Sequence, residues 1–150
     1  MAFERLFTTT ENQRNWGLLV LRLGVGFSMA AFHGYRKLMG GPELWTGLGG
    51  YMENLGIGFL PVFWGFMAMF AEFFGSLALM LGFFFRPAAL LLTATMFVAV
   101  TRHLNLPPEA DGAGWRGASH ALELGAVFLG LFLAGPGKYS VDRLLRRGSS

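Results

Sequence analysis

Residues 61–104 decide the fold of this chain, and they read PVFWGFMAMFAEFFGSLALMLGFFFRPAALLLTATMFVAVTRHL. Between Glu53 and Arg102 the only charged side chains are Glu72 and Arg86. The apolar runs on the two sides of Arg86 each have about the 17 to 25 residues that cross the ~30 Å hydrocarbon core of a bilayer as a helix. Pro87 can end one helix and open the next. The stretch therefore predicts two membrane-spanning helices, at 61–85 and 87–104, joined by a tight hairpin turn.

Two further apolar runs, at 16–38 and 118–135, have the same length and character. Of the 150 residues, 53% are hydrophobic and only 14% are charged, about half the charge of an ordinary soluble domain. The 16 Phe and 8 Met side chains exceed what a chain of this size can bury in one aqueous core. We therefore expect an all-α membrane protein, built as a four-transmembrane-helix bundle.

The composition also excludes several classes of function. The chain has no cysteine, which excludes disulfides, thiol catalysis, iron–sulfur clusters and cysteine-ligated zinc. The formal net charge is +3, but the basic residues do not cluster on one polar surface, so we expect no nucleic-acid partner. Any redox chemistry must therefore use a bound cofactor.

An even number of spans places both termini on the same side of the membrane, and the positions of lysine and arginine indicate which side. Seven basic residues lie near helix ends on the terminal side, and four lie on the other side. The first set is Arg5, Arg14, Arg86, Lys138, Arg143, Arg146 and Arg147, and the second is Arg36, Lys37, Arg102 and Arg116. This distribution favours a multi-pass protein of the inner (cytoplasmic) membrane with both termini in the cytoplasm.

We expect three parts along the chain: a cytoplasmic N-terminal segment at 1–15, a four-helix transmembrane domain at 16–142 and a basic cytoplasmic tail at 143–150. In the first part, Phe3, Leu6 and Phe7 are compatible with a short amphipathic helix on the membrane surface or with a frayed terminus. Residues 148–150, Gly-Ser-Ser, resemble a cloning remnant.

The connection from 41 to 60 is long and contains six glycines. Its apolar residues recur at helical spacing from Leu44 to Leu55, which predicts an interfacial helix that covers the outer face as a lid. The glycines do not form a phosphate-binding loop, because no buried strand precedes them and no Gly-Lys-Ser/Thr follows.

Three charged residues, Arg22, Glu72 and Glu123, lie inside the apolar spans, where a charge costs about 2.5 to 3.5 kcal/mol. We therefore expect Arg22 and Glu72 to face the bundle interior, and at least one carboxylate to have a cationic or histidine partner. At about 1.5 Å per residue, most of the polar groups gather in the outer half of the bundle. The residues expected to form one polar cavity there, open to the exported face, are His33, Lys37, Glu72, Arg102, His103, His120 and Glu123, with Arg22 in the inner half as a further candidate for ligand binding or proton relay.

Two interpretations of these groups remain open. In the structural interpretation, Arg22 pairs with Glu72 or Glu123, His120 hydrogen-bonds Glu123, and the set fixes helix register. In the functional interpretation, donors and carboxylates in a low-dielectric cavity bind a polar head group or relay protons.

Three groups of residues carry a family resemblance. They are Leu21-Arg22-Leu23-Gly24 followed by His33-Gly34-Tyr35-Arg36-Lys37-Leu38; Ala71-Glu72-Phe73-Phe74-Gly75 through Leu81-Gly82-Phe83 to Arg86; and Gly135-Pro136-Gly137-Lys138-Tyr139-Ser140-Val141-Asp142. With them the chain, over about residues 16–142, resembles the DoxX family of small bacterial membrane proteins, which includes the DoxD-like subunits of thiosulfate:quinone oxidoreductases. The resemblance implies four helices, polar residues at Arg22, His33, Lys37, Glu72 and Glu123, and a redox-linked role in a bacterial membrane.

The leading hypothesis is a quinone-interacting or redox-associated membrane subunit. A quinone needs proton donors at its carbonyls and an apolar channel for its tail, and we expect Met69, Phe70 and Phe73 to supply apolar walls for its head group. His120→Ala and Glu123→Gln are then expected to weaken quinone binding. Electrons would come from a soluble or membrane redox partner, so the chain alone is a candidate subunit of a quinone-linked oxidoreductase rather than a complete enzyme.

The alternatives are a non-catalytic assembly or scaffold subunit, including a homo-oligomer, and a small-solute or proton transporter. Besides the lipid bilayer, the expected partners are a quinone or another amphipathic small molecule. Haem b between His33 and His120 is not favoured, because axial histidines cannot be told from hydrogen-bonding ones by sequence. We expect no metal, since a helical-bundle di-iron site needs about four carboxylates and the spans contain only Glu72 and Glu123.

Overall fold

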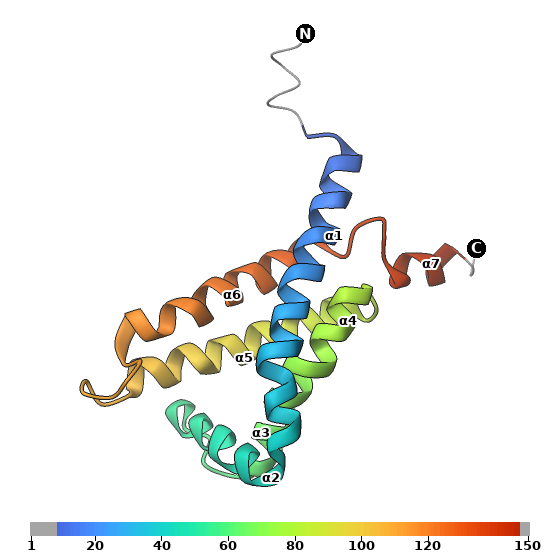
Figure 1. Ribbon diagram of the computed structural model, residues 1–150. Helices are drawn as coiled ribbons and strands as arrows, with labels where there is room; N and C mark the ends of the chain where they lie inside the picture. The colour runs from blue at the N-terminus through green and yellow to red at the C-terminus, as the bar shows by residue number, and fades with distance from the viewer. Residues whose placement is uncertain (1–8, 148–150) are drawn as a thin grey trace.

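The computed structural model describes residues 9–147, and within that range the chain is helical and contains no β-strand (Figure 1). The elements are α1 (Glu11–Ser28), η2 (Met29–Gly34), α2 (Tyr35–Gly49), η3 (Gly50–Leu55), α3 (Pro61–Phe70), η4 (Ala71–Gly75), α4 (Ser76–Leu81), α5 (Phe85–Asn105), α6 (Gly114–Ala134) and α7 (Val141–Arg147). The predictions for Arg5, for Phe3, Leu6 and Phe7, and for residues 148–150 lie outside the described residues.

Four helical segments of the described range are long and apolar enough to cross a membrane, which confirms the all-α, four-span prediction. The first runs from α1 through η2 into α2, the second consists of α3, η4 and α4, and the third and fourth are α5 and α6. Figure 1 shows α5 and α6 as a hairpin that crosses α1 at a marked angle. Large apolar side chains such as Val20, Phe97 and Leu133 are exposed on the outer faces of these helices, where they contact the lipid bilayer.

The first span ends at Gly41 and Pro42. Gly41 leaves the helical conformation at φ 62° and ψ −164°, which glycine adopts without a side-chain clash. The chain resumes a helix at residues 42–49, continues as η3, and turns back against α3 and α5. We call residues 42–55 the return segment. The helix predicted in the 41–60 connection is therefore present.

Two glycines bring the return segment into direct backbone contact with the second span. A Cβ atom at Gly49 would lie 1.7 Å from the carbonyl oxygen of Pro61, and one at Gly65 would lie 1.9 Å from that of Trp45. Small residues allow helix backbones to approach this closely in membranes. The return segment therefore packs closely against the second span.

The hairpin between the second and third spans turns at 82–84 rather than at the predicted Phe85-Arg86-Pro87. Gly82 adopts φ 66°, and α5 begins at Phe85, so Pro87 falls in the first turn of that helix. The earlier turn has a physical cause that the apolar pattern does not contain: the backbone N–H groups of Phe84 and Phe85 donate to the carboxylate of Asp142, each at 3.0 Å.

The two ends of the described chain lie on the same face of the bundle. The backbone N–H of Lys138, which precedes α7, donates to Oδ1 of Asn15 in the first turns of α1 at 2.8 Å. The α4–α5 turn lies on this face too, through its contact with Asp142. We call it the terminal face. The buried hydrophobic core of the described residues includes Leu92 of α5 and Phe128 of α6.

Candidate functional site

Two π-helical turns, η2 in the first span and η4 in the second, pack against each other. Gly34 at the end of η2 makes this contact possible, because a Cβ atom there would lie 2.6 Å from the backbone N of Phe73. Turns of this kind often occur at functional sites, and one extra residue rotates the following side chains by about 100° around the helix axis. The candidate site lies where these two turns meet.

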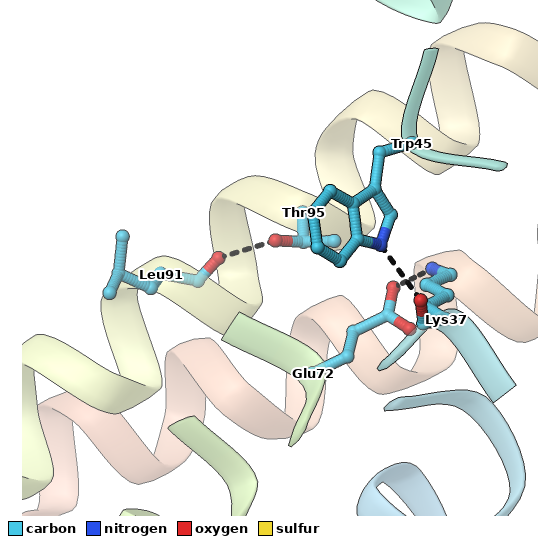
Figure 2. Close-up of polar contacts among 5 residues, drawn as sticks. All are labelled: Lys37, Trp45, Glu72, Leu91 and Thr95. Carbon is cyan, nitrogen blue, oxygen red and sulfur yellow. Dashed lines mark hydrogen bonds and ion pairs between the residues drawn. The ribbon is translucent and has the colours of Figure 1, made fainter. Parts of the chain in front are cut away.

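Glu72 lies within η4 and is 2% exposed. Its Oε1 atom forms an ion pair with Nζ of Lys37, and Figure 2 shows the two groups pointing toward each other. Its Oε2 atom is buried and has no hydrogen-bond partner among the described residues. The predictions that Glu72 faces the interior and that at least one of the two carboxylates has a cationic or histidine partner are confirmed.

Trp45 ties the return segment to this ion pair. Its indole Nε1 donates to the carbonyl oxygen of Lys37 at 2.8 Å, as Figure 2 shows. Because Gly41 and Pro42 reverse the chain, Trp45 folds back over the residue that pairs with Glu72. The return segment therefore helps to fix the position of Lys37.

A cavity of about 370 Å³ adjoins the ion pair, and we call it the return-segment cavity. The return segment, the second span and α5 enclose it, and its walls are largely apolar. Its lining residues are Lys37, Leu48, Tyr51, Met52, Phe63, Trp64, Met67, Ala68, Ala71, Glu72, Leu91, Ala94, Thr95, Val98, Ala99 and Arg102. The helix in the 41–60 connection, which was expected to cover a polar cavity, thus forms one wall of this largely apolar cavity.

A second cation lines the return-segment cavity from the last turn of α5. The guanidinium of Arg102 lies 4.5 Å from the ring centroid of Tyr51, within the range of a cation–π contact. Its Nε atom is buried without a hydrogen-bond partner among residues 9–147. Two residues that line the cavity, Glu72 and Arg102, thus each have a buried polar atom without a partner among the described residues.

The other predicted site residues, His33, His103, His120 and Glu123, lie outside the return-segment cavity. His33 and His120 stack on each other, with ring centroids 5.9 Å apart. His120 and Glu123 are exposed on α6, and no hydrogen bond joins them. His103 Nδ1 lies 2.7 Å from the carbonyl oxygen of Gly112 in the α5–α6 loop. Of the seven residues expected to converge, only Lys37, Glu72 and Arg102 line the return-segment cavity.

Arg22 is buried, as predicted, but its partners are not carboxylates. It is 3% exposed, and its two terminal nitrogens donate to the carbonyl oxygens of Pro136 and Tyr139. The interpretation that Arg22 pairs with Glu72 or Glu123 is therefore wrong. The reason is that the stretch after α6, at residues 135–142, folds back over the terminal face and offers backbone carbonyls to the guanidinium. We call this stretch the clasp.

Asp142 completes the clasp at the α4–α5 turn. While its carboxylate accepts from the first N–H groups of α5, its own backbone N–H donates to the carbonyl oxygen of Gly82 at 2.9 Å. Gly82 has no room for a side chain, because a Cβ atom there would lie 2.6 Å from that of Ser140. The Gly-Pro-Gly-Lys-Tyr-Ser-x-Asp stretch, one of those that carry the family resemblance, thus joins α1, α4 and α5.

Sequence reasoning missed most of the cavity walls. Met69, Phe70 and Phe73 were expected there, but Met67, Ala68 and Ala71 occupy the lining instead. Met67 and Ala71 follow Phe63 at a spacing of four residues, and Ala68 follows Trp64 in the same way, so these residues share one helix face, and Met69, Phe70 and Phe73 lie off it. Tyr51 and Trp64 were also missed, although aromatic residues within the glycine-rich connection and at the start of a span are a signal that could have found them.

No group of three or more His, Asp or Glu side chains in the described part of the chain is arranged to hold a metal ion. The charged groups among the residues that line the cavity are one carboxylate, one ammonium and one guanidinium, and most of the other lining residues are apolar. Such a site can donate hydrogen bonds to carbonyl oxygens, accept one from a hydroxyl group, and exchange a proton through the carboxylate.

Comparisons with known proteins agree with the resemblance in the sequence. The DoxX family profile matches residues 17–104. The chain is 34% identical over 115 residues to inner membrane protein YqjF of Escherichia coli (strain K12), and the matched stretch covers 76% of this chain and 81% of that protein. It is 32% identical over 133 residues to inner membrane protein YphA of the same organism, covering 84% and 88%. No solved structure matches the chain significantly. The chain therefore belongs to the DoxX family.

Proposed function

We propose that the chain is a quinone-interacting subunit of the bacterial inner membrane, with the quinone ring in the return-segment cavity. The observation that carries the proposal is the unpaired Oε2 atom of Glu72, which is buried beside this cavity. A buried acceptor without a partner costs about 1–3 kcal/mol, and a ligand hydroxyl in the cavity would remove that cost. The inner-membrane assignment follows the names of the two relatives.

The size and walls of the return-segment cavity suit a quinone head group. About 370 Å³ lies within the ~300–1,000 Å³ of ordinary ligand pockets, which combine apolar walls with a few polar groups. Two of the lining residues are exposed: Phe63 of α3, at 48%, and Ala94 of α5. The cavity thus reaches the lipid-facing surface between α3 and α5, the side from which a lipophilic molecule would enter.

The three polar groups match the two redox forms of a quinone. The ammonium of Lys37 and the guanidinium of Arg102 are donors for the carbonyl oxygens of the oxidised form, and Glu72 is an acceptor for a hydroxyl of the reduced form. Converting a quinone to a quinol takes two electrons and two protons. Glu72 is the residue we propose to pass protons, and a soluble or membrane redox partner would supply the electrons.

A titration of the protein in lipid nanodiscs with a short-chain ubiquinone analogue tests this proposal. Quinones quench tryptophan fluorescence, and Trp64 lines the cavity. We expect Glu72→Gln to weaken binding of the analogue's reduced form, whose hydroxyl donates to Glu72, about 12- to 150-fold, which corresponds to about 1.5–3 kcal/mol for a lost hydrogen bond to a charged group. Arg102→Gln, which leaves the Lys37–Glu72 pair intact, is expected to weaken binding of the oxidised form, whose carbonyl oxygen loses a donor.

Glu123→Gln is the matched control, because it makes the same chemical change at an exposed position outside the cavity. We expect it to bind the analogue as the parent protein does. Equal affinity of the parent, Glu72→Gln and Arg102→Gln would contradict the proposal. So would an effect confined to Glu123→Gln, which would favour the predicted His120–Glu123 site instead.

The exposed pair of polar side chains on α6 favours a second candidate function, an assembly or scaffold subunit. Glu123 is exposed on a membrane-spanning helix, where a charge is costly unless another protein covers it, and His120 is exposed one turn away although its ring stacks on His33. A second copy of the chain or another membrane subunit would provide that cover. Native mass spectrometry is expected to show Glu123→Leu with fewer associated subunits than the parent and with unchanged quinone affinity.

The orientation of the chain is also a proposal. Among the described residues, Arg14, Arg86, Arg143 and Arg146 gather on the terminal face, and positive charge is retained in the cytoplasm. We propose that this face is cytoplasmic. A C-terminal fusion to a reporter that is active only in the cytoplasm is expected to be active, and a fusion to a reporter that is active only in the periplasm is expected to be inactive. The reverse pattern would contradict the assignment.

A further inference from the structure

A second cavity, of about 1070 Å³, opens on the terminal face, and we call it the terminal-face pocket. It lies between the start of α1, the start of α5, the clasp and α7. Four arginines from three helices line it: Arg14, Arg86, Arg143 and Arg146. None of the return-segment cavity's lining residues takes part in it, so the two cavities are separate.

The positive charge of the terminal-face pocket is not neutralised within residues 9–147. Asp142 is the only acid in its lining, and both of its carboxylate oxygens already accept N–H groups from the start of α5. No ion pair joins the four arginines to an acid of the described chain. Arg86 instead lies over the ring of Phe132, with its guanidinium carbon 5.9 Å from the ring centroid.

The pocket is also partly apolar. Leu18, Pro87 and Ala134 line it beside the arginines, and Phe84 lines it while remaining 64% exposed. A ligand that uses the whole pocket therefore needs an anionic group next to a hydrocarbon part. Inorganic phosphate or another small soluble anion has only the first of these.

We propose that the terminal-face pocket binds the head group of an anionic phospholipid. Guanidinium groups match phosphate oxygens through paired N–H donors, and basic pockets between membrane helices recognise anionic lipid head groups. In this arrangement the phosphate lies among the arginines of α1, α5 and α7, and the first acyl carbons lie against Leu18 and Phe84. The lipid then bridges elements that the clasp also joins.

The test compares lipid additives during thermal unfolding of the protein in a neutral detergent. Phosphatidylglycerol is expected to raise the midpoint of unfolding in a concentration-dependent way, while phosphatidylcholine at the same concentration and inorganic phosphate leave it unchanged. High salt is expected to reduce the effect, since it screens exposed charges. An equal effect of phosphatidylcholine, or an equal effect of phosphate alone, would overturn the proposal, the latter by identifying a site for free anions.

A pair of double variants locates the effect. Arg14→Gln/Arg143→Gln removes two lining charges on different helices, from side chains that form no hydrogen bond or ion pair among the described residues. We expect this variant to need at least a tenfold higher phosphatidylglycerol concentration for the same stabilisation. Arg36→Gln/Arg116→Gln removes the same charge from two exposed positions outside the pocket and is expected to respond as the parent does. Identical responses of the two double variants would overturn the proposal. If the first double variant does not fold, the comparison of phosphatidylglycerol with phosphatidylcholine and phosphate on the parent protein still tests the proposal.

Discussion

Arg22→Met is the substitution that most directly probes the clasp. Arg22 donates two hydrogen bonds to the carbonyl oxygens of Pro136 and Tyr139, and it is almost fully buried. A hydrogen bond from a charged group contributes about 1.5–3 kcal/mol, so the two contribute about 3–6 kcal/mol. Methionine fills similar space and removes the cost of burying a charge, which leaves an expected net loss of about 2–4 kcal/mol in the free energy of opening the clasp.

Trypsin provides a local measure of that opening, because Lys138 lies within the clasp. Since about 1.4 kcal/mol is a factor of ten in an equilibrium constant, we expect the open population, and with it the rate of cleavage after Lys138, to rise about 30- to 900-fold. Arg116→Met, at an exposed position on α6, is the control and should leave this rate unchanged. Cleavage of Arg22→Met at the parent rate would refute the assignment of Arg22 to the clasp.

Four further substitutions test the packing around the two cavities by thermal unfolding. Gly65→Ala places a methyl group 1.9 Å from the carbonyl oxygen of Trp45, and we expect it to lower the free energy of unfolding by about 1–3 kcal/mol or more. Gly47→Ala, with open space around it, is expected to leave this free energy unchanged or raise it slightly. Trp45→Phe removes the donor to the Lys37 carbonyl and is expected to cost about 0.5–1.5 kcal/mol. Asp142→Asn weakens the cap at the start of α5 and is expected to cost about 0.5–2 kcal/mol.

Each of these predictions has a result that would count against it. Equal stability of the two glycine variants would mean that the return segment does not contact α3 through its backbone. An unchanged midpoint of thermal unfolding for Trp45→Phe would mean that the hydrogen bond from the indole to the Lys37 carbonyl oxygen does not stabilise the chain reversal at Gly41 and Pro42. If Asp142→Asn were as stable as the parent protein, the carboxylate of Asp142 would not stabilise the α4–α5 turn.

The spans could be predicted from the sequence because their signal is additive along the chain. A run of about 20 predominantly apolar residues with few charges is long enough to cross a membrane as a helix. The helix in the 41–60 connection was predictable for a similar reason, since its apolar residues recur with a helical period. Burial of Arg22 and Glu72 followed from the cost of placing their charges in hydrocarbon.

The partners of those charges could not be predicted in the same way. Regular helical spacing put Arg22, His33 and Lys37 on one face, but η2 adds a residue to a turn between the first and the last of them. Side chains beyond it are rotated by about 100°, and Lys37 meets Glu72 while Arg22 meets the clasp. The clasp itself depends on a chain reversal after α6, a tertiary feature that no local pattern specifies.

Photolabelling tests the central claim, that the return-segment cavity holds the quinone ring, most directly. A photoreactive azido-quinone would be bound to the protein in nanodiscs, illuminated, and located by peptide mass spectrometry, with excess unlabelled quinone as competitor. The account predicts competed labelling within residues 61–72 of the second span and 91–102 of α5, the two stretches that face each other across the cavity. Competed labelling confined to α6 around His120 and Glu123, or labelling that the unlabelled quinone does not reduce, would contradict it.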